Sequence, residues 1–254
     1  MTVPKAKRKG PDSGPKTFYW ILGVVAVLGV GAIALATMRG NSQMVTEPLE
    51  ITDVPDAATL LARAQGIVVG PDDAPVDILV FSDFQCPACK HWALNVEQPL
   101  KAELVERGVA RLTYYDYPLP NHPHSFVVAR AARCAGDQDR FWEYHDLAFA
   151  QQEEWSYSSG TPTGSLKAFA RTLGLNPQRF DECLESDAHA ETVTANRMLG
   201  DQLGVRGTPT VFVNGRQLQA WQDYQAARAE IQQQTGALDR APVVAEPERT
   251  PSGP

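Results

Sequence analysis

The sequence predicts a mixed α/β domain with a block of helices inserted before its last long strand. Three observations predict this fold class. Two short apolar segments rich in β-branched residues, 76–82 and 109–119, flank a segment with helical spacing. Residues 122–203 have an almost wholly helical pattern. Residues 208–215 then indicate a strand, and a last helix follows, which completes an α/β layout with a helical insertion.

The first half of this domain is predicted by short local patterns. Residues 66–70 indicate an edge strand, and the apolar segment 76–82 indicates a buried one. From Pro87 to Gly108, apolar side chains recur about every four residues, which predicts a helix. Pro99 lies inside this helix and is expected to kink it. The segment 109–119 then provides the next strand.

The second half begins with the helical block. Turn-forming residues interrupt this block at Gly136, 157–164 and 174–177. The following strand ends in an Asn214-Gly215 pair, which is typical of a tight turn between two strands. Residues 224–234 have the pattern of a final helix. No internal repeat is present in the sequence.

The N-terminal segment from Phe18 to Met38 predicts a transmembrane anchor. Its 21 residues carry no charge, and a helix of this length is about 31 Å long, close to the roughly 30 Å of a bilayer's hydrocarbon core. The basic residues before it favour a cytoplasmic N-terminus. Ala34-Leu35-Ala36 resembles a cleavage site, but the apolar run exceeds the usual 7–15 residues of a signal peptide, so we expect an uncleaved single-pass anchor. Both alternatives export the rest of the chain.

Charge is unevenly distributed along the chain, whose net charge is -7. Residues 1–39 hold six lysine and arginine residues against Asp12, which leaves -12 for the remainder. A body this acidic repels nucleic acid, so we exclude that class of partner. We expect five regions: a basic cytoplasmic tail at 1–17, the anchor at 18–38, a polar linker at 39–56, the folded domain at 57–237 with its insertion at about 120–203, and a disordered tail at 238–254.

The motif that carries chemistry is the Cys86-Pro87-Ala88-Cys89 segment. A C-x-x-C pair serves a redox disulfide, a metal site or structure alone. Cys86 lies where a predicted strand ends and a helix begins, with Pro87 at the first helical position. A helix N-terminus stabilises a thiolate and lowers its pKa from about 8.5 into the range of about 3.5–7.5. Export also favours disulfide chemistry, because disulfides persist outside the cytoplasm.

The metal alternative has weaker support from the sequence. Zinc sites use four ligands, and structural sites usually pair two C-x-x-C segments. The only other cysteines, Cys134 and Cys183, are too far apart in the sequence to form a second such segment, and no histidine has ligand spacing with the first. We therefore expect no metal at Cys86 and Cys89 and no other cofactor.

Two separated motifs, "FSDFQCPACKHW" and "GVRGTPTVFVNG", together resemble the DsbA-like branch of the thioredoxin fold. The segment "ARCAGDQDRFWEYHDLAF" resembles the helical insertion of that branch, and the resemblance covers most of residues 66–235. It implies thiol-disulfide oxidoreductase activity with Cys86 and Cys89 as catalytic residues. It also implies a cis peptide bond before Pro209, facing the cysteines, with Thr208 lining the substrate-binding site. By itself "GTP" before a strand is equally typical of an ordinary turn.

The resemblance has two further implications. Relatives often join two helices of the insertion by a second disulfide, so Cys134 and Cys183 are expected to pair; two buried thiols are the alternative. Many relatives also carry a buried acid six residues before the first cysteine, where this chain has Val80. Asp83 is nearer to the pair, although a solvated or capping role explains it at least as well.

The histidines near these motifs have simpler explanations. His91 follows Cys89 closely, and we expect it to be exposed on the helix. His122 and His124 lie in "NHPHS" after the 109–119 strand. Either they border the active face, or they are ordinary residues of this loop. We keep both readings open.

These observations predict a membrane-anchored, extracytoplasmic thiol-disulfide oxidoreductase that forms disulfide bonds in exported proteins bearing thiols. The family implies re-oxidation by a quinone-linked membrane partner. A reductase or isomerase of the same compartment is the alternative within enzymes, because Pro87-Ala88 does not fix the direction of the reaction. A non-catalytic metallochaperone or chaperone is the alternative of another class.

Overall fold

The structure is a computed structural model that describes residues 19–20, 22–29, 44–54 and 56–236. The chain divides into two compact units, 1–42 and 43–254. In the first unit, Tyr19, Trp20 and residues 22–29 are helical. Among the described residues, no helix is both long and apolar enough to cross a membrane. Of the predicted anchor at 18–38, only Tyr19, Trp20 and residues 22–29 are described, and the tails at 1–17 and 238–254 lie wholly outside the described residues.

The second unit is built on a five-stranded sheet of order β1-β3-β2-β4-β5. The strands are β1 Ile67–Val69, β2 Val76–Ser82, β3 Ala110–Asp116, β4 Thr210–Val213 and β5 Arg216–Gln217. Only β2 and β3 are parallel among the pairs of described strands, with Val76 opposite Ala110 and Ser82 opposite Asp116. Asn214 and Gly215 both have positive φ, which is the conformation that a tight β4–β5 hairpin requires.

A long helical segment connects the two parallel strands. It comprises α3 Pro87–Trp92, a π-helical turn at Ala93–Glu97, α4 Gln98–Leu100 and a second π-helical turn at Lys101–Val105. Pro99 lies between the two π-helical turns. Proline lacks an N–H and its ring crowds the carbonyl four residues earlier, and wider turns relieve both constraints. The helix therefore continues past Pro99.

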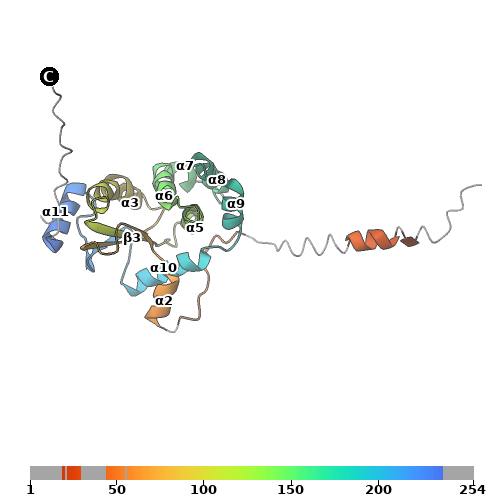
Figure 1. The fold of residues 1–254 in the computed structure, drawn as a ribbon, viewed down its shortest axis with the longest axis horizontal. Coiled ribbons are helices and arrows are strands. Elements are labelled where there is room, and N and C mark those ends of the chain that lie inside the picture. The colour runs from red at the N-terminus through yellow and green to blue at the C-terminus, as the bar shows by residue number, and fades with distance from the viewer. Residues whose placement is uncertain (1–18, 21, 30–43, 55, 237–254) are drawn as a thin grey trace, which may run out of the picture. The chain divides into compact units, whose positions relative to one another are not determined.

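The helical insertion contains six helices and follows β3. They are α5 Ser125–Gly136, α6 Phe141–Ala150, α7 Gln152–Ser156, α8 Thr163–Thr172, α9 Pro177–Glu185 and α10 Ala190–Gln202. Two further helices, α2 Ala57–Arg63 and α11 Tyr224–Thr235, come before β1 and after β5. Figure 1 shows α3, α5 and α6 on one side of the sheet and α2 and α10 on the other. The predicted succession of strands and helices is therefore present.

Each face of the sheet packs against its own hydrophobic core. Val76, Ile78 and Val80 of β2 belong to the larger core, together with residues of α3, α5 and α6. Phe81 points the other way and packs with residues of α2 and α10, such as Leu60. This alternation is what a strand covered on both faces requires. It leaves the carboxyl end of β2, just before Cys86, held from both sides.

The disulfide lies within the insertion. Cys134 of α5 and Cys183 of α9 have an S–S distance of 1.99 Å and a Cα–Cα distance of 5.8 Å. Cys134 is buried, whereas Cys183 is partly exposed. The two helices that the resemblance suggested are thus joined covalently.

The linker differs from its prediction. We expected 39–56 to be an unpacked spacer, but Met44 and Val45 pack against the larger core, and Ile51 and Val54 pack against the smaller one. The Leu49 N–H donates to Thr194 Oγ1 at 3.0 Å. Buried Arg130 also donates to the carbonyl of Val45. The spacer interpretation is wrong for residues 44–54 because a hydrophilic composition concealed the few apolar side chains that dock.

Candidate active site

Cys86 and Cys89 lie where β2 passes into α3, and both are free thiols. Cys86 precedes the first turn of α3 with an extended backbone, φ −77° and ψ 122°, and Pro87 follows it within that turn. The Cys86 carbonyl accepts from the N–H of Lys90 at 3.1 Å, which begins the helix. Cys86 is 8% exposed and Cys89 is fully buried. An incoming sulfur therefore has access only to Cys86.

The pKa of Cys86 is lowered to about 5. The largest cause is a hydrogen bond from the Cys89 thiol to the Cys86 sulfur, and Thr208 and the N–H groups of Cys89 and Ala88 act in the same direction. Burial opposes these effects. The sequence predicted the helix N-terminus as the cause, whereas the structure makes the neighbouring thiol the larger one. Cys86 is therefore a thiolate at neutral pH.

The pKa of Cys89 shifts in the opposite direction and lies well above its ordinary value. Burial is the main cause, and the adjacent Cys86 raises the pKa further. The Asp83 N–H lies 3.4 Å from the Cys89 sulfur. Cys89 thus remains a thiol where Cys86 has lost its proton. The two sulfurs are chemically distinct although they are only three residues apart.

Thr208 and Pro209 border the Cys86 sulfur from the loop that precedes β4. Their peptide bond is cis, as the resemblance implies. The Cys86 Sγ lies 3.5 Å from the Thr208 carbonyl oxygen. The structure therefore brings together all four residues that the sequence assigned to catalysis and substrate binding: Cys86, Cys89, Thr208 and Pro209.

Asp83 is buried rather than solvated, so the solvated reading of this residue is wrong. Its carboxylate accepts from the N–H of Gln85 at 2.7 Å, which closes the turn before Cys86. It also accepts from the N–H of Leu119 at 2.7 Å and lies 2.8 Å from Nδ1 of His122. The capping role therefore holds, and Asp83 in addition ties the β2–α3 turn to the loop after β3.

The three histidines of this region differ in their surroundings. His91 is exposed, as expected, and its Nε2 lies 2.7 Å from the Gln222 carbonyl oxygen. His124 is buried with Nε2 2.9 Å from the Ser158 carbonyl oxygen. The pKa of His122 is raised, first because of its hydrogen bond to Asp83. Of the two histidines in "NHPHS", His122 is thus the one whose imidazole contacts Asp83, whereas His124 reaches the active-site turn through its backbone N–H, which donates to Gln85 Oε1 at 2.8 Å.

No carboxylate occupies the position of Val80, which is buried in the larger core. Polar groups that the sequence did not single out lie nearby instead. Ser82 is buried at the end of β2, and its hydroxyl opposes the rise in the pKa of Cys89 that burial causes. Glu97 is fully buried and accepts from Trp92 Nε1 at 3.0 Å. In the sequence, the only sign that Glu97 is buried was its place directly after Val96, one of the regularly spaced apolar residues of the predicted helix.

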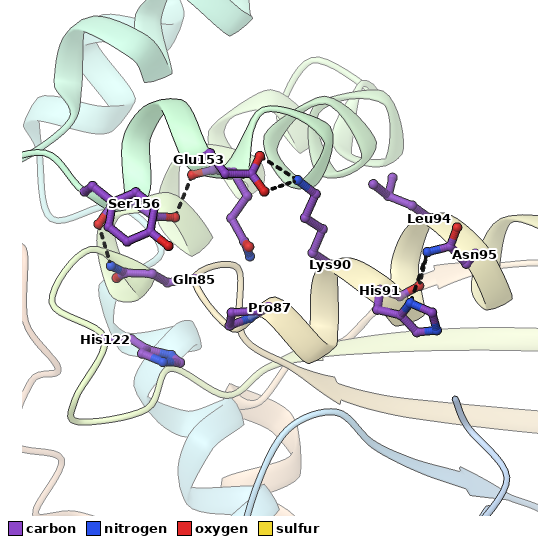
Figure 2. A pocket seen from close by; sticks show the side chains of 11 residues that line it. Gln85, Pro87, Lys90, His91, Leu94, Asn95, His122, Glu153 and Ser156 are labelled. Atoms are coloured by element: carbon purple, nitrogen blue, oxygen red, sulfur yellow. Dashed lines mark hydrogen bonds and ion pairs between the residues drawn. The ribbon is translucent and has the colours of Figure 1, made fainter. Parts of the chain in front are cut away.

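A cavity of about 550 Å³ opens beside Pro87. Its lining includes Pro87, Lys90, His91, His122, Glu153 and Tyr157. Figure 2 shows Lys90 reaching across to Glu153, and the two form an ion pair of 2.7 Å. His122 lies close to Pro87 and Gln85 in the same view. The cavity next to the cysteines therefore combines a mainly apolar lining with polar side chains and one ion pair.

A second set of sulfur and imidazole groups surrounds the Cys134–Cys183 disulfide. The ligand atoms of Cys134, Cys183 and His189 lie within 4.8 Å of one another, the one such potential metal-binding group found among the described residues. Because the two sulfurs are bonded to each other, they offer no thiolates to a metal. Asp137 Oδ2 lies 2.8 Å from His189 Nε2 and 3.5 Å from Cys183 Sγ.

Comparisons with known proteins agree with this geometry. A family model described as thioredoxin matches residues 63–233. The "Probable disulfide bond formation protein D" of Bacillus anthracis is 31% identical over 149 residues, which is 58% of this chain and 69% of the relative. The oxidised crystal structure of BdbD from Bacillus subtilis is 25% identical with a TM-score of 0.59 and covers 66% of this chain and 92% of that one.

A different kind of relative shares the same region. The Na(+)/H(+) antiporter NhaA 1 of Salinispora arenicola is 37% identical over 150 residues, or 59% of this chain. The chain spans only 22% of that antiporter's length. The similarity therefore concerns one part of a much longer protein.

Proposed function

The chain belongs to the thioredoxin family, within its DsbA-like disulfide oxidoreductases, and on this premise we propose that it is an extracytoplasmic oxidase of protein thiols. Two of its relatives are named a probable disulfide bond formation protein, from Bacillus anthracis, and a putative protein-disulfide oxidoreductase, from Rickettsia typhi, and its activity is that of a protein thiol-disulfide oxidoreductase. The proposal adds a direction, the formation of disulfides, and a compartment, the outer face of the cell membrane.

The observation that carries the direction is the difference between the two sulfurs. Cys86 has a pKa of about 5, so it is a stabilised thiolate when the pair is reduced. Whatever stabilises the reduced form raises the reduction potential of the pair and makes it an oxidant. The low pKa of Cys86 also makes it a good leaving group in exchange. Both effects favour an oxidase over a reductase.

The reaction consists of two exchanges. A substrate thiolate attacks Cys86 Sγ of the oxidised pair, the Cys86–Cys89 bond breaks, and Cys89 leaves with the bonding electrons and takes up a proton. A second substrate thiolate then attacks the substrate sulfur of the mixed disulfide, and Cys86 leaves as a thiolate. The substrate loses two electrons and gains a disulfide, and the cysteine pair gains the same two electrons.

Re-oxidation of the pair requires an electron acceptor. We propose a quinone-linked membrane oxidoreductase in this role, reached through the predicted anchor at 18–38. The support is the uncharged 21-residue segment and the basic residues that precede it. The substrates proposed are exported proteins that carry free thiols.

Trapping tests this function. The Cys89→Ala variant cannot form the Cys86–Cys89 bond, but its Cys86 thiolate can attack a disulfide of an exported protein, the reverse of the second exchange, and one substrate sulfur leaves as a thiolate. Because Cys89 is absent and cannot resolve the product, mixed disulfides between Cys86 and exported proteins accumulate. The matched control is Cys86→Ser, which forms none because it lacks the attacking sulfur. Absence of mixed disulfides in Cys89→Ala cells, with the variant present in the membrane fraction, would refute the proposal.

A further inference from the structure

Asp83 and His122 form an ion pair beside the turn that carries Cys86. Asp83 follows β2 directly, and His122 lies in the loop between β3 and α5. The His122 side chain is 17% exposed and that of Asp83 is fully buried. Three donors hold the carboxylate, namely two backbone N–H groups and His122 Nδ1. A carboxylate fixed in this way also fixes the imidazole that it binds.

The charge of His122 is coupled to the Cys86 sulfur. Its pKa is raised first by the hydrogen bond to Asp83, against an opposing effect of burial, and then by the charges of Asp83 and Cys86. Coupling between two sites is mutual, so a thiolate that favours the imidazolium is itself favoured by that imidazolium. A protonated His122 is thus within electrostatic reach of Cys86, whose N–H donates to the Asp83 carbonyl oxygen at 3.1 Å in the same turn.

Other charged groups line the two cavities that His122 borders, and two of them, Lys90 and Arg197, have partners of their own. Lys90 and His91 share its cavity, yet Lys90 is paired with Glu153 at 2.7 Å. A second cavity on its other side is lined by groups that include Glu47, His124 and Arg197. Arg197 donates to the Pro118 carbonyl oxygen at 2.9 Å and lies over the ring of Tyr117. Of the groups named here, His122 is the one whose side chain is hydrogen-bonded to the Asp83 carboxylate beside Cys86.

We propose that the Asp83–His122 pair is the electrostatic partner of the Cys86 sulfur, with His122 supplying a positive charge and Asp83 positioning it. This inference deepens the oxidoreductase function proposed above and rests on it. The Pro87-Ala88 dipeptide between the two cysteines has no ionisable side chain. The charge therefore comes from a loop that lies 36 positions further along the chain.

The role is clearest in the second exchange. The bond between Cys86 and the substrate sulfur breaks, the incoming substrate thiolate forms the new S–S bond, and Cys86 leaves with the bonding electron pair. His122 keeps its proton and stabilises the departing thiolate through space. Electrons and protons balance without a further co-reactant. The Asp83 carboxylate touches neither reacting sulfur: it holds His122 and closes the turn before Cys86.

The test is the ionisation of Cys86 in the reduced full chain. His122→Asn retains a donor nitrogen at the position of Nδ1 for Asp83 but removes the positive charge. The rate at which iodoacetamide alkylates Cys86, located by mass spectrometry, is measured against pH. We expect the midpoint to rise by about 0.5–1 pH unit, with Asp83→Asn shifting it in the same direction. A tenfold lower equilibrium constant for the oxidation of glutathione by the Cys86/Cys89 pair then corresponds to a reduction potential of the pair that is about 30 mV lower.

Two histidine variants are the controls. His91→Gln alters a histidine of the same cavity, and His189→Gln alters the other His–Asp pair while keeping a nitrogen at the position of Nε2. Both are expected to leave the midpoint unchanged. An unchanged midpoint in folded His122→Asn, or an equal shift in His91→Gln, would overturn the inference; His122→Asn decides it alone if Asp83→Asn does not fold.

Failure of this inference can be distinguished from failure of the proposed function. Alkylation requires no substrate protein, so it reports on Cys86 whether or not the chain is an oxidase. A native chain without oxidase activity whose midpoint still shifts in His122→Asn overturns the function and retains the electrostatic pair. Full oxidase activity with an unshifted midpoint overturns the pair and retains the function.

Discussion

The two cysteine pairs of this chain have opposite environments. Cys86 and Cys89 are free thiols at the start of α3, and Cys86 lies 3.5 Å from the Thr208 carbonyl oxygen. Cys134 and Cys183 lie within α5 and α9 and are joined to each other across 49 positions of sequence. One pair lies where backbone N–H groups and a second thiol stabilise a thiolate, and the other cross-links two helices.

A histidine paired with an aspartate lies near each set of sulfurs. The distance between the imidazole nitrogen and the carboxylate oxygen is 2.8 Å in both pairs. A nearby His–Asp pair is therefore not sufficient to make a reactive cysteine. The difference is the backbone position of the sulfur: Cys86 precedes a helix, whereas Cys134 and Cys183 lie inside helices whose N–H groups are already used. The following predictions test this contrast, from the largest effect to the smallest.

The largest effect on disulfide formation is expected from removing Cys86, whereas removing the second cysteine pair is expected to have little effect. Cys86→Ser abolishes disulfide formation in a reduced, unfolded substrate protein and returns the rate to that of the uncatalysed reaction, because no other sulfur is accessible as a thiolate. Cys134→Ala with Cys183→Ala retains most of that activity. The measurement is the rate of thiol loss in the substrate. Substantial activity in Cys86→Ser would show that the second pair also exchanges.

The second prediction concerns stability. Cys134→Ala with Cys183→Ala lowers the free energy of unfolding by about 2–4 kcal/mol, because the cross-link no longer restricts the unfolded chain. Chemical denaturation of the oxidised native chain and of the double variant measures the difference. The alkylation midpoint of Cys86 is expected to stay the same in both. A shift of that midpoint would mean that the insertion controls the active site.

The third prediction concerns pH. The folded pKa of Cys86 is depressed from its ordinary value of 9.0 to about 5, so its contribution to stability is present above pH 9 and is lost as the pH falls through 5. The reduced chain therefore gains stability between about pH 5 and pH 9 relative to the oxidised chain, whose sulfurs do not titrate. Denaturation of both forms across this range measures the effect. Parallel curves would contradict the low pKa.

The smallest effect is expected at the second His–Asp pair. His189 and Asp137 have partly exposed side chains, 25% and 47% respectively. Exposed ion pairs contribute about 0–1 kcal/mol, so His189→Gln is expected to lower the free energy of unfolding by less than about 1 kcal/mol. A loss as large as that of the disulfide variant would show that this pair supports the cross-link.

The sequence was informative where local pattern determines structure. The apolar, β-branched run of β2, the Pro87 helix start and the Asn214-Gly215 turn each predict a feature that the structure contains, because each depends on neighbouring residues alone. The site residues followed from two separated motifs that only a known family connects. Thr208 and Cys86 are 122 positions apart, and no periodicity relates them.

The remaining features depend on the path of loops and could not be predicted in this way. His122 reaches Asp83 because the segment after β3 turns back over the carboxyl end of β2. Residues 44–54 dock through isolated apolar side chains and backbone hydrogen bonds to Thr194 and Arg130. Buried Glu97 accepts from Trp92 Nε1 through one carboxylate oxygen, and Lys101 Nζ lies 3.4 Å from the other, both within a π-helical region whose spacing differs from the regular helical one. Tertiary contacts, rather than local propensity, decide each of these.

The central claim, that the Cys86/Cys89 pair is an oxidant, is tested most directly by its reduction potential. Equilibration of the full chain with glutathione buffers, followed by quantification of reduced Cys86, gives this value. The stabilised Cys86 thiolate predicts a potential well above about −180 mV. A value near −270 mV, typical of a reductase, would contradict the account.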